Sequence, residues 1–515
     1  MRVRGVVLLG GALITAAAAA CARVVTRQLV RPEQAATLDH KSPFLKAHLR
    51  SGYVYVLQEW SWSDSSGTVS GFGTLYDTDR HAVGPAARVT LPRDSAALFE
   101  TNVSHLSGSA VALTVMAGVT AAVAVGCAFN PKACFGSCPT FYAPDSLGRS
   151  VLQAEGFSAS IAPGLEASDI DALYRARATN RDFSLRLTNE ALETHVVRYA
   201  DLLVAPRPPN GRVFVTPSGE FRSATSLTAP TLCSAPEGDC RAALTAFDER
   251  ERFTAADSND LGARETIDLE FTHPPAGPLG VVVTARQSLM TTFLIYQALA
   301  YMGNDAGRWL ASLSKSTPDT ARAESIMAHM LGRIDVLVPD DSGGWRVVGQ
   351  TGETGPIAAD TKLIPIPRST TGTTRLRLRL TKGLWRIDWV ALASLGDVVR
   401  PIRVSPSMVR RGAMPDSAAL EALTLRREPL TTMPGDELQL DYRLPEHPER
   451  LDLFLEARGY YLEWMRREWM AETNPRAAAR LLLDPGAMLR DLAHPYKRQE
   501  AMMDSLFWNS RYAKP

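Results

Sequence analysis

The 515-residue chain carries 56 Lys and Arg against 55 Asp and Glu, which gives a formal net charge of +1. This balance argues against nucleic-acid binding and against electrostatic attraction to an anionic membrane, because both need a concentrated positive surface. The length suffices for roughly three or four domains. The 33 prolines and 36 glycines favour many short strands and turns over a helical bundle.

Residues 1–21 have the composition of a bacterial lipoprotein export signal. Arg2 and Arg4 give a positive start, residues 6–14 are apolar, and small residues lead to Cys21. Lipid on Cys21 would hold the mature protein on the periplasmic face of a bacterial membrane, with the outer membrane preferred over the inner one. An ordinary signal peptide and an uncleaved anchor are the alternatives, although the apolar core is short for a membrane span.

The next three segments differ sharply in pattern. Residues 22–43 lack periodicity and predict a tether. Residues 44–105 alternate apolar and polar residues between glycine turns, which predicts a small SH3-like or Sm-like β-barrel. Residues 106–130 contain a long uncharged run, 109–129. This run predicts an apolar helix that is buried or lies on the membrane surface, and a true membrane span is the alternative.

The rest of the chain predicts β-domains followed by helices, so the fold class is mainly β with some α. Residues 131–330 form a cysteine-stapled β-domain with a helix near 288–313, and residues 331–458 form a β-sandwich-like domain. In the strand TRLRLRLT, leucines face one way and arginines the other; a solvated arginine face is preferred over an anion site. Residues 459–515 predict amphipathic helices.

The cysteines beyond Cys21 suit an oxidising compartment. Two close pairs are candidate disulfides, Cys134 with Cys138 and Cys233 with Cys240. Connectivity cannot be derived from spacing alone, because Cys127 is able to pair with any of these four. A zinc site at Cys134 and Cys138 is the alternative, but no second ligand pair accompanies it.

The cysteine block also carries a family resemblance. NPKACFGSCPTFY, with AEGFSASI and NEALETHVVRYADLL further along, resembles a family of uncharacterised bacterial envelope lipoproteins. The resemblance implies an architecture of small barrel, β-sandwich-like body and helical C-terminus. It brings no established activity to these residues.

Few residues suggest catalysis, because nucleophile-elbow, zinc-protease, Walker and dinucleotide motifs are all absent. Glu193 and His195 are two apart in a strand pattern, so the carboxylate could orient the imidazole for base catalysis or metal binding. A structural polar pair is the alternative. Trp385, Asp388 and Trp389 resemble a sugar platform. Strand alternation, however, places both tryptophans on one face and Asp388 on the other, which favours core packing.

A further acidic group includes Glu166, Asp169 and Asp171. Its spacing lacks the glycine and final glutamate of a calcium-binding EF-hand loop. We therefore expect a helix N-terminus here, with Ser168 as the N-cap and acidic residues in the first turn.

These observations predict an exported, lipid-anchored protein that binds glycan or another envelope protein without catalysing a reaction. No cofactor, metal or nucleic acid is predicted. One alternative is an envelope hydrolase that uses Glu193 and His195. Another is a component of an envelope assembly or export complex, which would show an exposed apolar patch around Trp464 and Trp469.

Overall fold

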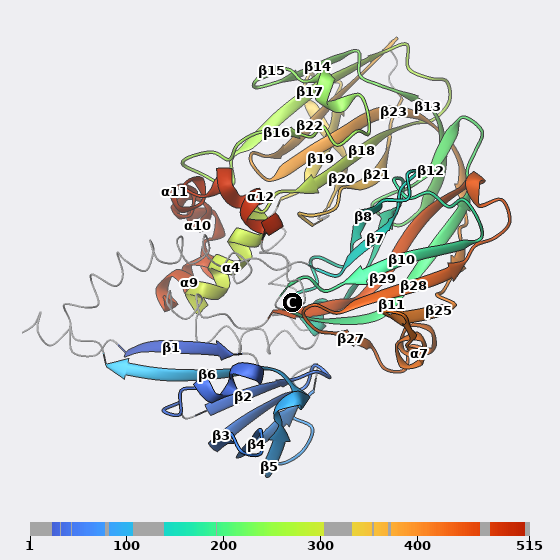
Figure 1. Cartoon of the computed structure of the whole chain (residues 1–515). Coiled ribbons are helices and arrows are strands. Elements are labelled where there is room, and N and C mark those ends of the chain that lie inside the picture. Colours follow the sequence, from blue (N-terminus) through green and yellow to red (C-terminus); the bar gives the residue numbers. More distant parts are fainter. Residues whose placement is uncertain are drawn as a thin grey trace, which may run out of the picture.

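The structure is a computed structural model of the whole chain (Figure 1). It describes residues 23–30, 32–42, 44–77, 82–106, 138–191, 193–302, 332–352, 355–368, 372–463 and 474–509. Within these ranges the chain is mainly β, as predicted, and its strands form five sheets. None of the described helices is long and apolar enough to cross a membrane. The signal segment with Cys21, most of the expected apolar helix at 106–130, Cys127 and Cys134 lie outside the described residues.

The N-terminal sheet has six antiparallel strands in the order β1-β6-β2-β3-β4-β5. They are β1 (Arg23–Val30), β2 (Phe44–Leu49), β3 (Val54–Ser63), β4 (Thr68–Tyr76), β5 (Ala87–Pro92) and β6 (Ala96–Leu106), with short helices η2 (Pro32–Thr37) and η3 (Arg93–Ser95). Leu45, Leu57 and Phe99 are fully buried in its core. The predicted tether at 22–43 is wrong, because β1 pairs with β6 along its whole length and is part of this sheet.

The first sandwich is built from two distant parts of the chain, 138–206 and 402–463. One sheet contains β7 (Thr140–Pro144), β8 (Ser150–Glu155), β10 (Asp182–Thr188), β25 (Met408–Arg411), β26 (Met414–Pro415) and β28 (Glu437–Arg443). The other contains β9 (Ala167–Ala172), β11 (Glu193–Pro206), β24 (Ile402–Val404), β27 (Leu430–Thr432) and β29 (Leu451–Glu463). The short helices η5 (Pro163–Leu165), α7 (Ser417–Leu425) and η7 (Pro448–Arg450) connect them. Leu185, Leu202 and Leu455 pack between the two sheets.

The inserted sandwich occupies the stretch between β11 and β24. One sheet contains β12 (Gly211–Val215), β13 (Phe221–Thr228), β16 (Arg252–Phe253), β18 (Leu279–Gln287), β21 (Asp360–Ile366) and β23 (Trp385–Val399). The other contains β14 (Leu232–Ala235), β15 (Gly238–Asp239), β17 (Arg264–Thr272), β19 (Ile334–Pro339), β20 (Trp345–Thr351) and β22 (Thr373–Thr381), and α3 (Arg241–Leu244) follows β15. The leucines of β22 are buried, whereas Arg375, Arg377 and Arg379 pair with acidic side chains.

The expected domain boundary at residue 331 is wrong. Strands on either side of it pair in one sheet, since β18 pairs with both β21 and β23. The first sandwich crosses the boundary as well, because β10 pairs with β28 and β11 with β29. Alternating residues identify a strand and its buried face, but they do not identify its partner.

Helices cover one end of the inserted sandwich (Figure 1). They are α4 (Met290–Met302), α9 (Pro475–Leu483), α10 (Pro485–Asp491), α11 (Ala493–Lys497) and α12 (Glu500–Asn509). The helix expected near 288–313 is present as α4 up to Met302, and the remainder falls outside the described residues. The expected helical start at 459 is wrong, because β29 continues as a strand to Glu463. Trp464 and Trp469 lie outside the described residues.

The two sandwiches share an aromatic core. Phe454 of the first sandwich meets Phe221 of the inserted one with ring centroids 4.9 Å apart, edge to face. Tyr174 meets Phe214 in the same geometry at 5.6 Å. Edge-to-face aromatic pairs add to the stability gained from burying the rings. The contact between the sandwiches is therefore a packed core.

Replacing Phe454 with Ala should test this core. The side chain is fully buried, so we expect a loss of about 3–5 kcal/mol in the free energy of unfolding. Urea denaturation measures the loss. The control is Phe72→Ala, because Phe72 is 43% exposed. A loss at Phe454 no larger than that at Phe72 would contradict a shared core.

Candidate functional site

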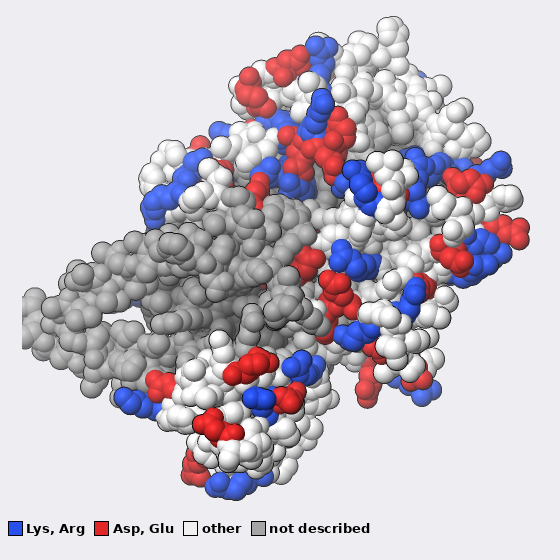
Figure 2. Space-filling view, in the orientation of Figure 1, with Lys and Arg blue, Asp and Glu red and all other residues white. Residues whose placement is uncertain are grey.

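A pocket lies where the first sandwich, the inserted sandwich and α4 meet. The first sandwich contributes Glu155, Glu193 and Glu463 to its lining. The inserted sandwich contributes Gln287, and α4 contributes Thr291 and Tyr296. On the molecular face that Figure 2 shows, acidic and basic side chains are interleaved over both sandwiches. The pocket, rather than a charged surface, is therefore the candidate site.

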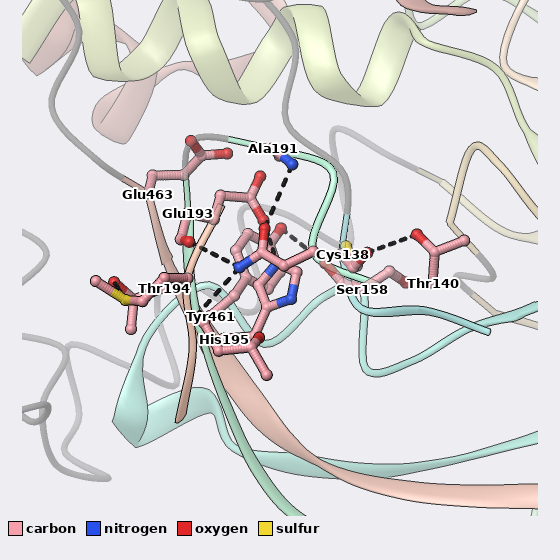
Figure 3. A network of polar contacts seen from close by, with 12 residues as sticks. Cys138, Thr140, Ser158, Ala191, Glu193, Thr194, His195, Tyr461 and Glu463 are labelled. Carbon is pink, nitrogen blue, oxygen red and sulfur yellow. Dashed lines mark hydrogen bonds and ion pairs between the residues drawn. The ribbon is translucent and has the colours of Figure 1, made fainter. Parts of the chain in front are cut away.

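Glu193 and His195 lie at the start of β11 and interact as the sequence predicts. His195 Nε2 is 3.0 Å from Glu193 Oε2, and both side chains are buried. Strand β29 places Tyr461 opposite His195 and Glu463 opposite Glu193. Figure 3 shows these four residues gathered where the two strands run side by side. A period of two along a strand therefore brings the predicted pair together.

Access differs between the two members of this pair. Both side chains are buried, but only Glu193 is among the residues that line the pocket. The imidazole edge faces Tyr461, with ring centroids 6.4 Å apart. A general base has to come within hydrogen-bond reach of the proton that it removes. The geometry thus favours a structural role for His195, which orients Glu193.

Tyr461 lines the pocket beside Glu193 and His195. Its hydroxyl donates a hydrogen bond to the Ser158 carbonyl oxygen at 3.0 Å. Burial raises the pKa of Tyr461 well above its ordinary value, and the nearby Cys138 and Glu193 raise it further. The phenol therefore stays neutral and acts as a fixed hydrogen-bond donor.

Gln287 is the residue that the sequence analysis missed. It ends β18, is fully buried and lines the pocket. Among the described residues, neither its amide nitrogen nor its amide oxygen has a hydrogen-bond partner. Buried polar groups in native proteins are almost always paired, so an amide with both ends unsatisfied requires an explanation. The only signal in the sequence is a polar residue at the end of a strand that begins with an apolar run, Leu279 to Val283.

Three hydrogen bonds tie the pocket walls together. Tyr296 of α4 donates to Glu463 Oε1 at 2.9 Å, which joins the helix to β29. The Ile357 amide donates to Glu155 Oε2 at 2.8 Å, which joins a loop of the inserted sandwich to β8. The Gln287 backbone amide donates to the Gly355 carbonyl at 2.9 Å. These hydrogen bonds therefore connect both sandwiches and α4 around the pocket.

The expected placement of Trp385, Asp388 and Trp389 is wrong. Strand β23 contains a bulge: Thr284 pairs with Trp389, but the next residue, Ala285, pairs with Ile387. The extra residue, Asp388, reverses the alternation, so the two tryptophans belong to opposite faces. Trp385 is buried in the inserted core, and Trp389 packs toward the shared aromatic core.

Asp388 itself is buried in the bulge and accepts a hydrogen bond from the Asp248 amide at 3.3 Å. Burial raises its pKa to about 6. A sugar platform needs a solvent-facing ring beside its polar group. With Trp385 inside the core and Asp388 enclosed, these residues do not form one.

The structure also bears on the predicted cysteine pairs and on the acidic group around Asp169. The Cys233–Cys240 disulfide is confirmed. Cys138 is buried with its sulfur 3.7 Å from the Ser158 carbonyl, and its predicted partner Cys134 is outside the described residues. Asp169 lies in β9, which pairs with β29, so the expected helix N-terminus is wrong. No described group of three or more His, Cys, Asp or Glu side chains is arranged to hold a metal ion.

No protein-family model and no curated protein matches this chain. Similar solved structures include the carbohydrate-binding module TmCBM61 in complex with β-1,4-galactotriose, 12% identical over 37% of this chain and 86% of that chain, TM-score 0.14. They also include infectious bursal disease virus, Gx strain, 10% identical over 94% of this chain and 88% of that chain, TM-score 0.13. TM-scores this low carry no functional argument.

Removing the imidazole should show whether His195 supports the site. His195→Ala leaves a cavity and deprives the buried Glu193 of a hydrogen bond, so we expect a loss of about 2–4 kcal/mol in unfolding free energy. Chemical denaturation measures it. His447→Ala is the control, because the His447 side chain is 73% exposed. Equal stability of the two variants would contradict a structural role.

Proposed function

We propose that this chain is an exported, lipid-anchored envelope protein that binds a neutral polyhydroxyl ligand, such as a glycan, in the pocket between its sandwiches. The observation that carries the proposal is Gln287. Among the described residues its amide has no hydrogen-bond partner, and Gln287 belongs to the lining of a pocket that Thr291 and Tyr296 also line. A carboxamide donates through its nitrogen and accepts through its oxygen. Adjacent sugar hydroxyls offer the same pair of functions.

The energetics support a ligand at this point. A buried polar group without a partner costs about 1–3 kcal/mol relative to a satisfied one. A ligand hydroxyl at each end of the Gln287 amide would remove that cost, and solvent-accessible hydroxyl groups are abundant in envelope glycans. Binding pockets commonly place a few polar groups within a mainly apolar lining at an interface between domains. The junction of the two sandwiches places such polar groups around a cavity of about 40 Å³, which admits one small part of a ligand.

Catalysis is the weaker candidate. The hydrolase alternative needs His195 as a base, but that imidazole is not among the residues that line the pocket. Binding requires only the groups that line the pocket. We therefore place the function in recognition.

The export part of the proposal rests on Cys21 and the preceding segment. The Cys233–Cys240 disulfide agrees with it, because disulfides form and persist in oxidising compartments. A lipid anchor would keep the pocket in the envelope, close to glycan.

Replacing Gln287 with Leu is the sharpest test of the pocket. Leucine has a similar size but no polar atoms, so the variant should be at least as stable as wild type without ligand. Retention on arrays of neutral oligosaccharides should fall at least tenfold, about 1.4 kcal/mol.

The matched control is Gln153→Leu. Gln153 is also buried, and its amide nitrogen has no hydrogen-bond partner in the part of the chain that the structure describes, but it does not line the pocket. Its replacement should leave retention unchanged. Wild-type retention equal to that of Gln287→Leu, or no retention of any oligosaccharide, would contradict glycan binding in this pocket.

The anchor is tested separately with Cys21→Ser. In cells labelled with radioactive palmitate, the wild-type protein should take up label and sediment with membranes. The serine variant should do neither, because the acylated thiol is missing. An unlabelled wild-type protein would remove the anchor from the proposal and leave the pocket unaffected.

A further inference from the structure

A second group of polar residues joins the two sandwiches along the edge strand β9. Asp169 and Asp171 project from β9 of the first sandwich, and Asp360 and Lys362 come from β21 of the inserted one. These four residues are called the junction cluster below. Lys362 Nζ donates to the Ile170 carbonyl oxygen at 2.8 Å and lies 2.5 Å from Asp360 Oδ2. The lysine therefore connects the inserted sandwich directly to the edge of the first.

The junction cluster has more acidic groups than basic ones. Three carboxyl groups surround one ammonium group, so full ionisation leaves an excess of negative charge. Asp171 is only 4% exposed, and its Oδ2 has no hydrogen-bond partner among the described residues. An ionised carboxylate in such a place is costly, whereas a protonated one is tolerated.

The two carboxyl groups differ in their hydrogen bonds: Asp169 Oδ1 accepts one from the Ile170 amide at 2.9 Å, whereas Asp171 Oδ2 has no partner among the described residues. On β29 their pairing partners are Ala457 and Leu455, both apolar. On β8 the nearby titratable group is Glu155, another carboxyl. The other two members of the junction cluster, Asp360 and Lys362, also act on this pair.

We propose that the junction cluster is a pH-sensitive contact between the sandwiches, which tightens as the pH falls from 8 to 5 and weakens as the pH rises. Protonation of Asp169 and Asp171 removes repulsion among the carboxyl groups and leaves Lys362 with Asp360. The proposal goes beyond ligand binding and does not depend on it.

The direction follows from linkage. Burial raises the pKa of Asp169 to about 6 and that of Asp171 well above its ordinary value. A carboxyl group with a raised pKa in the folded state contributes stability that is fully present below its unfolded pKa. That stability is lost as the pH rises through the folded pKa. The loss should begin near pH 4, pass through pH 6 for Asp169, and extend higher for Asp171.

The test compares the whole protein with Asp169→Asn by urea denaturation, without ligand, at pH 5 and pH 8. An asparagine cannot ionise, so the folding equilibrium constant of wild type relative to the variant should fall about tenfold from pH 5 to pH 8. Asp171→Asn is the second variant and should act in the same direction. Asp397→Asn is the control, because Asp397 is exposed on β23.

A local measurement separates this contact from general stability. Hydrogen exchange in β9 and β21, corrected for its intrinsic pH dependence, should accelerate from pH 5 to pH 8 in wild type and less so in Asp169→Asn or Asp171→Asn. If both variants retain the wild-type pH dependence in denaturation and in exchange, the proposal is overturned. Oligosaccharide retention has no part in this outcome.

Discussion

The architecture depends on one long strand pairing, that of β11 with β29. Their register runs from Glu193 with Glu463 to Pro206 with Leu451, and nearly the whole inserted sandwich lies between them in the sequence. Asp201 lies in this ladder, fully buried, and accepts hydrogen bonds from Arg403 and Arg426. Arg403 lies in β24, where the chain returns from the insertion. An ion pair at the return point holds both ends of the insertion against the same ladder.

The sequence correctly predicts features that depend only on residues close together in the chain, such as the buried face of a strand and a disulfide across a short loop. Leu376, Leu378 and Leu380 are all fully buried, as alternation requires, and Glu193 meets His195 because residues two apart share a face. Close cysteines at 233 and 240 formed the expected disulfide, since a short loop brings their Cα atoms within range.

Long-range pairing is what the sequence could not predict. The sequence predicts a tether where strand β1 lies. The reason is that its partner, β6, comes some seventy residues later in the chain, and no local pattern indicates that the two strands pair. The same reason explains the false boundary at 331. The bulge at Asp388 is subtler: one extra residue reverses which face Trp389 occupies, and a polar residue in a strand does not by itself reveal a bulge. The sequence does not mark Gln287 as a site residue, because the relevant feature is the absence of hydrogen-bond partners for its amide among the described residues. That feature can be seen only in the folded structure.

Gln287 and Asp171 both have side-chain atoms without a hydrogen-bond partner among the described residues, and both lie where the two sandwiches meet. The shared aromatic core around Phe454 already provides the packing that holds the sandwiches together, so the polar groups are not needed for adhesion. In such a position they lower stability, because burial removes water without supplying partners. The aromatic core offsets this cost at the junction, where Gln287 lines the pocket and Asp171 lies within the contact. Recognition and pH response would then both belong to the junction, and neither sandwich alone would have them.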